Sequence, residues 1–472
     1  MALLDRIRMR PAPEPSSRKV RSHAARHESS EPSSRNAAQE ERSREIERKR
    51  KREHQYQEFK SRVHERLFER IDFSKLAKVS EERASSDIAD LTLRILDEEK
   101  ALFNTEERQK LVSEIQDEVF GLGPLEPLLH DPTICDILVN RYDQIYIERQ
   151  GRLEVTAVRF LDDGHLMRII EKILTRVGRR VDESTPMMDA RLKDGSRVNV
   201  IIPPLALDGP TLSIRRFSEE ALTADSLVES GSITPAAVTL LEACVVGRLN
   251  ILISGGTGSG KTTLLNMLSA FVPESERIVS IEDSAELQLH QEHVVRLETR
   301  PPNIEGKGQV SQRELVINCL RMRPDRIIVG EVRGVEALDM LQAMSTGHEG
   351  SLTTVHANTP RDALMRVGTM VAMSGLEIPA STIRAQMGSA IDLVIQVERF
   401  SDGSRGVTHI NEVTGASESE VTMQELFALE RRGVSSDGRV ERILSATGLR
   451  PSFLEKLRGR GIDPSDSLFV AA

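Results

Sequence analysis

The stretch GGTGSGKTT, residues 255–263, constrains the fold of this chain more than any other feature of the sequence. It follows the apolar run LNILIS, and TTLLNMLSAF at its end continues as an amphipathic helix. A strand, a glycine-rich turn and a helix in this order direct backbone N–H groups and a positive helix end at a phosphate. Gly255, Gly260, Lys261 and Thr262 meet the pattern G-x-x-x-x-G-K-[ST], which predicts an α/β nucleotide-binding domain.

Each residue type in this loop has a physical role toward a nucleotide. Glycines let N–H groups converge on phosphate oxygens, Lys261 reaches the β- and γ-phosphates, and the Thr262 hydroxyl ligates Mg²⁺. The predicted phosphate-binding residues are Gly255, Gly256, Thr257, Gly258, Ser259, Gly260, Lys261, Thr262 and Thr263. The alternative is a structural turn, which the flanking strand and helix disfavour. Because the sequence has no N-K-x-D guanine motif, ATP with Mg²⁺ is the expected ligand.

Two other strand-like runs end in acidic residues, as is expected beside a nucleotide. RIVSIEDSAEL ends its β-branched run at Glu282 and Asp283, and PDRIIVGEVRG ends its run at Glu331. The second run resembles a Walker B strand, with Gly330 where many ATPases carry Asp. Glu331 is predicted to act on Mg²⁺ or its water, Glu282 to orient or activate the attacking water, and Asp283 to join the nucleotide site. The two glutamates can exchange roles, and a solvated strand end is the alternative for each.

The stretch TGHEGSLTTVHAN, residues 346–358, carries His348 and His356. Hydroxyl and imidazole groups beside a nucleotide suit a γ-phosphate sensor, so both histidines are candidates for this role. A structural role is the alternative. Metal binding by the pair is disfavoured, because no cysteine or third histidine lies nearby in the sequence.

Composition limits the partners that we expect. A formal net charge of -9, 3% aromatic residues and no Trp argue against a general nucleic-acid binder. The basic cluster Arg48–Arg52 favours nucleic acid or anionic lipid, but the interleaved glutamates favour a solvated helical face. Cys135, Cys244 and Cys319 are scattered, which indicates a reducing compartment and no zinc site. The start MALLDRIRMRPAPEPSS does not resemble a secretory signal, and no run approaches about 18 apolar residues, so we expect a cytoplasmic protein.

The composition and the pattern of apolar residues change several times along the chain, which predicts several domains. Asn104 with Glu107 predicts a capping box at a helix start, and Asp194 with Gly195 predicts a hairpin. Strands alternate with helices after about residue 232, which predicts a mainly parallel sheet. We expect a disordered charged extension at 1–55, a helical region at 56–120, an α+β domain at 121–217, a linker at 218–231, the nucleotide-binding domain at 232–400 and its C-terminal extension at 401–472.

Four segments, in this order and spacing, resemble the boxes of the secretion ATPase superfamily, which drives type II and type IV secretion and type IV pili. GGTGSGKTT, IEDSAEL, RIIVGEVRG and TGHEGSLTTVHAN match its Walker A, aspartate, Walker B and histidine boxes. VFGLGPLEPLLHDPTICDILVN, DGSRVNVIIPPL, LSIRRF and ATGLRPSFLEKL are similar to the CpaF/TadA branch, the ATPases of tight-adherence (Flp) pilus assembly. The similarity covers about residues 115–460. The absent four-cysteine module separates the chain from the GspE-like type II branch, and ATGLRPSF separates it from the shorter VirB11-type conjugation ATPases.

The resemblance implies a fold and a set of arginines. The implied fold class is α/β: a RecA-like P-loop NTPase domain, a preceding α+β N-terminal domain, and a helical, partly disordered N-terminal extension. ATP would lie between the two domains, and the N-terminal domain would supply arginines that stabilise phosphoryl charge. Arg197 in GSRVN and Arg215 in LSIRR match those positions, and Arg191 and Arg216 are weaker candidates. Without the resemblance, these would be ordinary strand-surface arginines.

The resemblance also implies a function. It is an ATP hydrolase motor in a hexameric ring, which couples hydrolysis to domain motion and acts on inner-membrane platform proteins from the cytoplasmic side. A nucleic-acid translocase, a VirB11-type conjugation ATPase and a regulatory ring without useful turnover are the alternatives.

Overall fold

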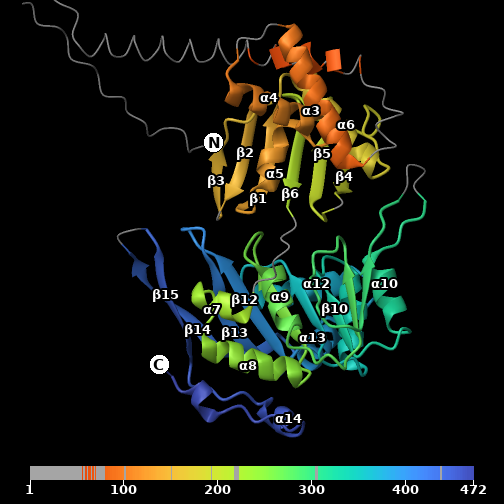
Figure 1. The fold of residues 1–472 in the computed structure, drawn as a ribbon. Helices are drawn as coiled ribbons and strands as arrows, with labels where there is room; N and C mark the ends of the chain where they lie inside the picture. Colours follow the sequence, from red (N-terminus) through yellow and green to blue (C-terminus); the bar gives the residue numbers. More distant parts are fainter. Residues whose placement is uncertain are drawn as a thin grey trace, which may run out of the picture. The chain divides into compact units, whose positions relative to one another are not determined.

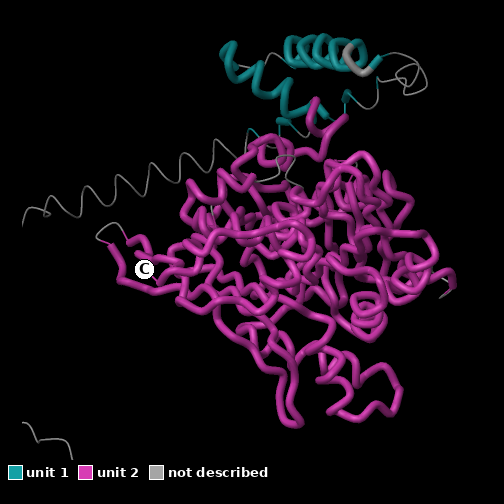
Figure 2. Tube along the Cα trace, turned by 90° about the horizontal axis from the view of Figure 1, so that it is seen from below, with its two compact units in different colours: residues 1–115 teal, residues 116–472 magenta. Residues whose placement is uncertain are grey.

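The computed structural model describes residues 80–99, 103–149, 151–192, 194–216, 223–302, 307–435 and 438–471, with scattered positions between 56 and 70. The chain divides into two compact units, residues 1–115 and 116–472 (Figure 2). The expected disordered extension, with the cluster Arg48–Arg52, lies outside the described residues. In the part of the chain that is described, no helix combines the length and the apolar character that crossing a bilayer requires.

The described part of the first unit contains helices. Helix α3 (Glu81–Glu98) buries Ile88, Ile95 and Leu96, and helix α4 (Thr105–Val119) begins in this unit and continues beyond it. The predicted capping box is confirmed, because Asn104 Oδ1 accepts from Glu107 N at 2.8 Å and Glu107 Oε2 accepts from Asn104 N at 3.1 Å. The predicted helix starting at Asn104 therefore exists with its expected cap.

The second unit contains a six-stranded antiparallel sheet (Figure 1). Its strands, in the order β3-β2-β1-β6-β5-β4, are β1 (Ile134–Arg141), β2 (Gln144–Arg149), β3 (Arg152–Val155), β4 (Met187–Arg191), β5 (Arg197–Ile201) and β6 (Thr211–Arg215). The short helices η1 (Gly123–Leu125) and α5 (Glu126–His130) and the longer α6 (Asp163–Arg176) cover one face through apolar side chains. The predicted hairpin is present between β4 and β5, with Gly195 at φ +90°.

Alternation along these strands gives the sheet a second, polar face. Side chains of a strand point alternately to opposite faces. Val198 and Ile214 enter the core, so their neighbours Arg197 and Arg215 lie on the other face. The pairing of Arg197 with Arg215 across β5 and β6 sets the two arginines side by side.

The second unit also contains a nine-stranded sheet in the order β15-β14-β13-β12-β7-β11-β10-β8-β9. Its strands are β7 (Ile251–Gly255), β8 (Ile278–Glu282), β9 (Val294–Glu298), β10 (Arg326–Val329), β11 (Leu352–Val355), β12 (Leu393–Arg399), β13 (Arg405–Ala416), β14 (Val421–Val434) and β15 (Val440–Ala446). From β12 to β9 the neighbouring strands are parallel, and β13, β14 and β15 add antiparallel pairs. The predicted mainly parallel sheet is confirmed, and with it the α/β fold class.

Helices cover both faces of this sheet, which is why its parallel strands are apolar on both sides. One face packs on α7 (Ala224–Glu229), α8 (Pro235–Val246), α9 (Lys261–Ser269), α14 (Leu454–Arg458) and η2 (Asp466–Phe469). The other face packs on α10 (Gln312–Cys319), α11 (Glu336–Ser345), α12 (Pro360–Ala372) and α13 (Ala380–Ala390). The central strands thus lie inside two apolar cores, and their carboxyl ends form a rigid edge.

A buried arginine joins several elements at the edge where the parallel strands begin. Arg326, the first residue of β10, is 0% exposed, and its Nε lies 2.5 Å from Glu276 Oε2. Its Nη1 and Nη2 donate to Gly350 O at 3.1 Å and Val245 O at 2.8 Å. A Cβ at Gly350 would collide with Nη1, so glycine is required there. The side chain therefore ties β10 to the end of α8 and to the start of β11.

Replacing Arg326 with methionine is expected to lower the free energy of unfolding by about 2–4 kcal/mol, because the carbonyl oxygens of Gly350 and Val245 lose their buried donor. Glu276 loses its ion pair with Arg326 but keeps the one with Arg248 at 3.0 Å. Thermal and urea unfolding of the purified chain measure this loss. Arg321→Met, an exposed position just before β10, is the control and is expected to change stability by less than about 0.5 kcal/mol. Equal unfolding midpoints for Arg326→Met and wild type would contradict the account of this cluster.

Candidate functional site

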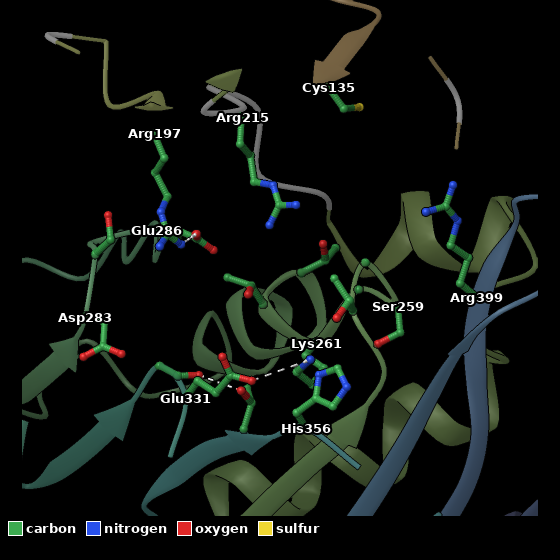
Figure 3. A pocket seen from close by; sticks show the side chains of 18 of the residues that line it. Cys135, Arg197, Arg215, Ser259, Lys261, Asp283, Glu286, Glu331, His356 and Arg399 are labelled. Atoms are coloured by element: carbon green, nitrogen blue, oxygen red, sulfur yellow. Dashed lines mark hydrogen bonds and ion pairs between the residues drawn. The ribbon is translucent and has the colours of Figure 1, made fainter. Parts of the chain in front are cut away.

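A cavity of about 650 Å³ lies at the carboxyl ends of the parallel strands, against the polar face of the six-stranded sheet (Figure 3). It brings together most of the residues predicted from sequence: Thr257, Gly258, Ser259, Gly260, Lys261, Thr262, Thr263, Glu282, Asp283, Glu331, His356, Arg197, Arg215 and Arg216. Gly255 and Gly256 form the base of the loop, but His348 and Arg191 are not among the lining residues. The carboxyl edge of a parallel sheet is where α/β proteins bind ligands.

The loop after β7 has the conformation that holds an anion. Gly258 and Gly260 have φ of +67° and +99°, in the left-handed region that favours glycine. A Cβ at Gly255 would come within 2.6 Å of Val397 O, so the loop base also requires glycine. Ser259 Oγ donates to Gly256 O at 2.9 Å and closes the turn, after which α9 begins at Lys261. The N–H groups at the start of α9 therefore point into the cavity with the positive end of the helix.

Lys261 lies inside the loop without a close counter-ion. Its Nζ donates to Gly255 O at 3.1 Å and to Gly256 O at 3.0 Å. The nearest carboxylate oxygen among its ion pairs is Glu331 Oε1, 3.9 Å away. Burial lowers the pKa of Lys261, and Glu331 opposes this shift. An anion entering the loop would meet an ammonium group that only backbone carbonyls now satisfy.

Glu282, the last residue of β8, presents a buried carboxylate to the cavity. It is 3% exposed, and its Oε2 accepts from Glu286 N at 2.6 Å and from Leu287 N at 2.9 Å. Its Oε1 is buried and has no hydrogen-bond partner among the described residues. Burial raises the pKa of Glu282, and the two backbone hydrogen bonds oppose that shift. One oxygen is thus fixed by two hydrogen bonds, while the other is buried and has no hydrogen-bond partner among the described residues.

Glu331 lies beside Glu282 but has different partners. Its Oε2 is 2.6 Å from Arg333 Nη2, and Arg333 Nη1 is 3.2 Å from Asp283 Oδ2. Arg333 therefore pairs with both Glu331 and Asp283. A Cβ at Gly330 would come within 3.0 Å of Glu282 Cγ. The glycine that stands where many ATPases carry Asp is therefore explained by the space that Glu282 fills.

The two candidate histidines lie at opposite edges of the sheet, because the whole of β11 separates them. His356 follows β11 and lines the cavity, where burial and then Lys261 lower its pKa, which favours the neutral imidazole. His348 precedes β11, and its carbonyl oxygen accepts from Ser351 Oγ at 2.8 Å. The structure therefore brings only His356 to the phosphate loop.

The four candidate arginines also separate. Arg197 Nη1 lies 2.6 Å from Glu286 Oε1, and both groups face the cavity (Figure 3). Arg215 also reaches into the cavity, with its Nε 3.0 Å from Asp136 Oδ1. The guanidinium of Arg216 donates to Ile134 O at 3.1 Å on its own sheet.

Arg191 is engaged elsewhere. It donates to Ala285 O at 2.5 Å and lies 3.2 Å from Glu298 Oε2, beside a wider neighbouring cavity. Arg197 and Arg215 are thus the pair that faces the loop.

Sequence reasoning missed several charged residues of the cavity. They are Asp136, Glu148, Glu286, Arg333, Arg366, Arg399 and Arg405. Arg333 could have been predicted from the sequence, because it lies two residues after Glu331 in GEVRG. Glu148 and Arg405 are brought to the loop only by the folding of distant strands, and no local pattern marks them.

The residues of the cavity fit a nucleotide with Mg²⁺. The left-handed glycines and the helix start form a cradle for phosphates, and Lys261 has room for an anion. Thr262 and Glu331 are oxygen donors of the kind that Mg²⁺ prefers, and this ion is usually held by few side chains together with phosphates. Within the described ranges, no group of three or more His, Cys, Asp or Glu residues is arranged to hold a metal.

The sequence profile of the type II/IV secretion system protein family matches residues 118–429, about two thirds of the chain. The chain belongs to this family. The match begins just before the six-stranded sheet and ends in β14, so it covers both sides of the cavity. The resemblance to secretion ATPases is confirmed at this level.

Several proteins with assigned names are similar to the chain. A protein of Mycobacterium tuberculosis whose name assigns it to conjugal transfer is 38% identical over 329 residues, 68% of this chain and 92% of the relative. The conjugal transfer protein TrbB of Rhizobium radiobacter is 35% identical over 301 residues, 63% of this chain and 88% of the relative. The solved VirB11 ATPase of the Brucella suis type IV secretion system, in complex with sulphate, is 29% identical with a TM-score of 0.33, over 61% of this chain and 95% of that chain.

Proposed function

We propose that this chain hydrolyses ATP with Mg²⁺ in the cavity between its two sheets. The observation that carries the proposal is that three features converge on one loop. They are Lys261, the Glu282 carboxylate with its unpartnered Oε1, and the Arg197 and Arg215 pair from the other sheet. Membership of the type II/IV secretion system protein family supports it. The proposal includes the domain boundaries expected from the sequence: an α+β domain at 121–217, a linker at 218–231, an ATPase domain at 232–400 and its extension at 401–472.

The proposed roles follow from the environment of each residue. Lys261 and the N–H groups of the loop bind the β- and γ-phosphates, and Thr262 and Glu331 hold Mg²⁺, which when bound neutralises phosphate charge. Glu282 orients a water with its open Oε1 and accepts its proton. Arg197 and Arg215 leave Glu286 and Asp136 to stabilise the charge on the transferring phosphoryl group.

His356 is proposed to sense the γ-phosphate. Its neutral imidazole lies at the same edge as Lys261, so loss of the phosphate would remove a partner from both sides of the cleft. The two sheets would then separate, because a ligand drives motion only through contacts that differ between states.

We further propose that the chain works as a hexameric cytoplasmic motor on inner-membrane platform proteins of a Flp/Tad pilus or a related secretion apparatus. The stretches similar to the CpaF/TadA branch support a role in pilus assembly. Among them, ATGLRPSFLEKL is the one that distinguishes the chain from VirB11-type conjugation ATPases. A second candidate, a VirB11-type conjugation ATPase, is favoured by relatives named for conjugal transfer.

Deletion of the gene followed by imaging of surface pili separates these two functions. Loss of pili with unchanged plasmid transfer supports the pilus motor, whereas loss of transfer with intact pili supports conjugation. ATP hydrolysis by the purified chain with and without DNA tests the nucleic-acid translocase, which requires stimulation by DNA.

A further inference from the structure

Three charged residues that sequence reasoning missed meet at the rim of the cavity: Glu148, Arg399 and Arg405, here termed the clasp. Arg399 ends β12 and Arg405 begins β13, so one tight turn presents both arginines. Their Nη2 atoms lie 3.4 and 3.5 Å from the same oxygen, Glu148 Oε1. Glu148 belongs to β2, and its side chain is 13% exposed. One carboxylate of the six-stranded sheet therefore holds two guanidinium groups of the nine-stranded sheet.

Each arginine of the clasp also holds a backbone carbonyl. Arg405 Nε donates to Gly258 O, within the phosphate loop, at 2.8 Å. Arg399 donates to Gly151 O, in the turn between β2 and β3, and points from the end of β12 toward the side of the cavity where Arg215 lies (Figure 3). The clasp thus connects the phosphate loop, the six-stranded sheet and the β12–β13 turn by two ion pairs to Glu148 and by two hydrogen bonds from charged donors to backbone carbonyls.

The turn that carries the two arginines is closely packed and well braced. A Cβ at Gly151 would lie 2.8 Å from Gly403 O, so the β2–β3 turn rests directly on the β12–β13 turn. Asp402 accepts from Ser404 N at 2.9 Å and from Val440 N at 2.8 Å. The Ser404 hydroxyl also donates to Asp402, at 2.6 Å. Burial opposes the ionisation of Asp402, but these hydrogen bonds, that of the Ser404 hydroxyl first, outweigh it and hold its pKa at about 2. The arginines therefore extend from a fixed support.

We propose that the clasp closes the six-stranded sheet onto the phosphate loop and fixes the loop for nucleotide binding, an inference that rests on the proposed ATP hydrolysis. Glu148 is a positioning residue, because it holds the Arg405 guanidinium, and Arg405 in turn holds the Gly258 peptide. A loop ordered in advance lowers the entropy that binding must overcome. Nothing in the chemistry requires Glu148 to touch the phosphates.

Hydrogen–deuterium exchange of the full-length chain without nucleotide tests the positioning directly. Glu148→Gln keeps the shape of the side chain and removes its charge, so amides at 256–260 and 151–153 are expected to exchange at least several-fold faster than in wild type. Glu154→Gln is the matched control, because Glu154 pairs with Arg149 on its own sheet at 3.3 Å. Its exchange at both segments is expected to match wild type. Arg405→Lys, which keeps the positive charge, is expected to act in the same direction and serves if Glu148→Gln does not fold.

Nucleotide affinity supplies the second readout, with a fluorescent ADP analogue as the probe. Glu148→Gln, which removes the ion pairs, and Arg405→Gln, which removes the hydrogen bond to Gly258 O, are each expected to weaken binding about five- to tenfold. The double variant is expected to bind no more weakly than Arg405→Gln alone, because both changes break one connection.

The outcomes separate the clasp from the proposed hydrolysis. Wild-type exchange and affinity in Glu148→Gln, or effects that multiply in the double variant, would overturn the clasp while hydrolysis by wild type stands. A wild-type chain that binds no nucleotide overturns the proposed hydrolysis, and the clasp is then decided by the exchange of the two segments.

Discussion

Replacing Glu282 with glutamine is expected to lower ATP turnover by about 10²- to 10⁴-fold, the usual contribution of a general base. Nucleotide affinity is expected to stay within a few-fold of wild type, because glutamine has nearly the same shape and the phosphates lie on the loop. The structural reason is the carboxylate itself: Oε2 is fixed by two backbone N–H groups and Oε1 is buried without a partner. Single-turnover phosphate release, with a fluorescent nucleotide for affinity, measures both quantities.

Glu331→Gln is the comparison that separates the two acids. If Glu331 holds Mg²⁺, its loss is expected to be partly restored by raising the Mg²⁺ concentration, whereas the loss in Glu282→Gln is not. Full restoration of Glu282→Gln by Mg²⁺, with none for Glu331→Gln, would reverse the two roles.

The same assignment predicts a pH dependence. A general base works only when ionised, so turnover rises with pH through its pKa. Burial raises the pKa of Glu282, which moves the acid limb of the kcat profile above the pH range of an ordinary glutamate. The residual turnover of Glu282→Gln is expected to lack this limb, and an unchanged limb in that variant would assign it to another group.

Replacing Lys261 with alanine is expected to lower turnover by at least about 100- to 1000-fold, the cost of removing one preorganised donor from developing charge. Affinity is expected to fall as well, because Lys261 contacts the phosphates in the bound state and not only during the reaction. Lys110→Ala, at an exposed position on α4, is the matched control. A Lys261→Ala variant that binds and hydrolyses ATP like wild type would remove this loop from the active site.

The local patterns predicted those parts of the molecule that depend on neighbouring residues in sequence. The loop around Lys261, the capping box at Asn104 and the alternation that exposes Arg197 each depend on a few consecutive positions. Glu282 was predicted for the same reason, because a strand places its last residue at the carboxyl edge of the sheet.

Other features depend on which strands become neighbours. His348 and His356 share one sequence box, yet the length of β11 puts them at opposite edges of the sheet. Glu148 and Arg405 meet because the end of β2 and the start of β13, which belong to different sheets, come together, and the sequence contains no periodicity that pairs them. Gly330 is explained only by the side chain that the adjacent strand β8 presents.

Steady-state ATP turnover by the wild-type chain and by the double variant Arg197→Ala/Arg215→Ala tests most directly whether both sheets form one active site. Wild type is expected to release phosphate with Mg²⁺, and the double variant to do so at least about 100-fold more slowly. Arg152→Ala, an exposed arginine of the same sheet, is expected to match wild type. An inactive wild type, or a double variant as active as wild type, would contradict the account.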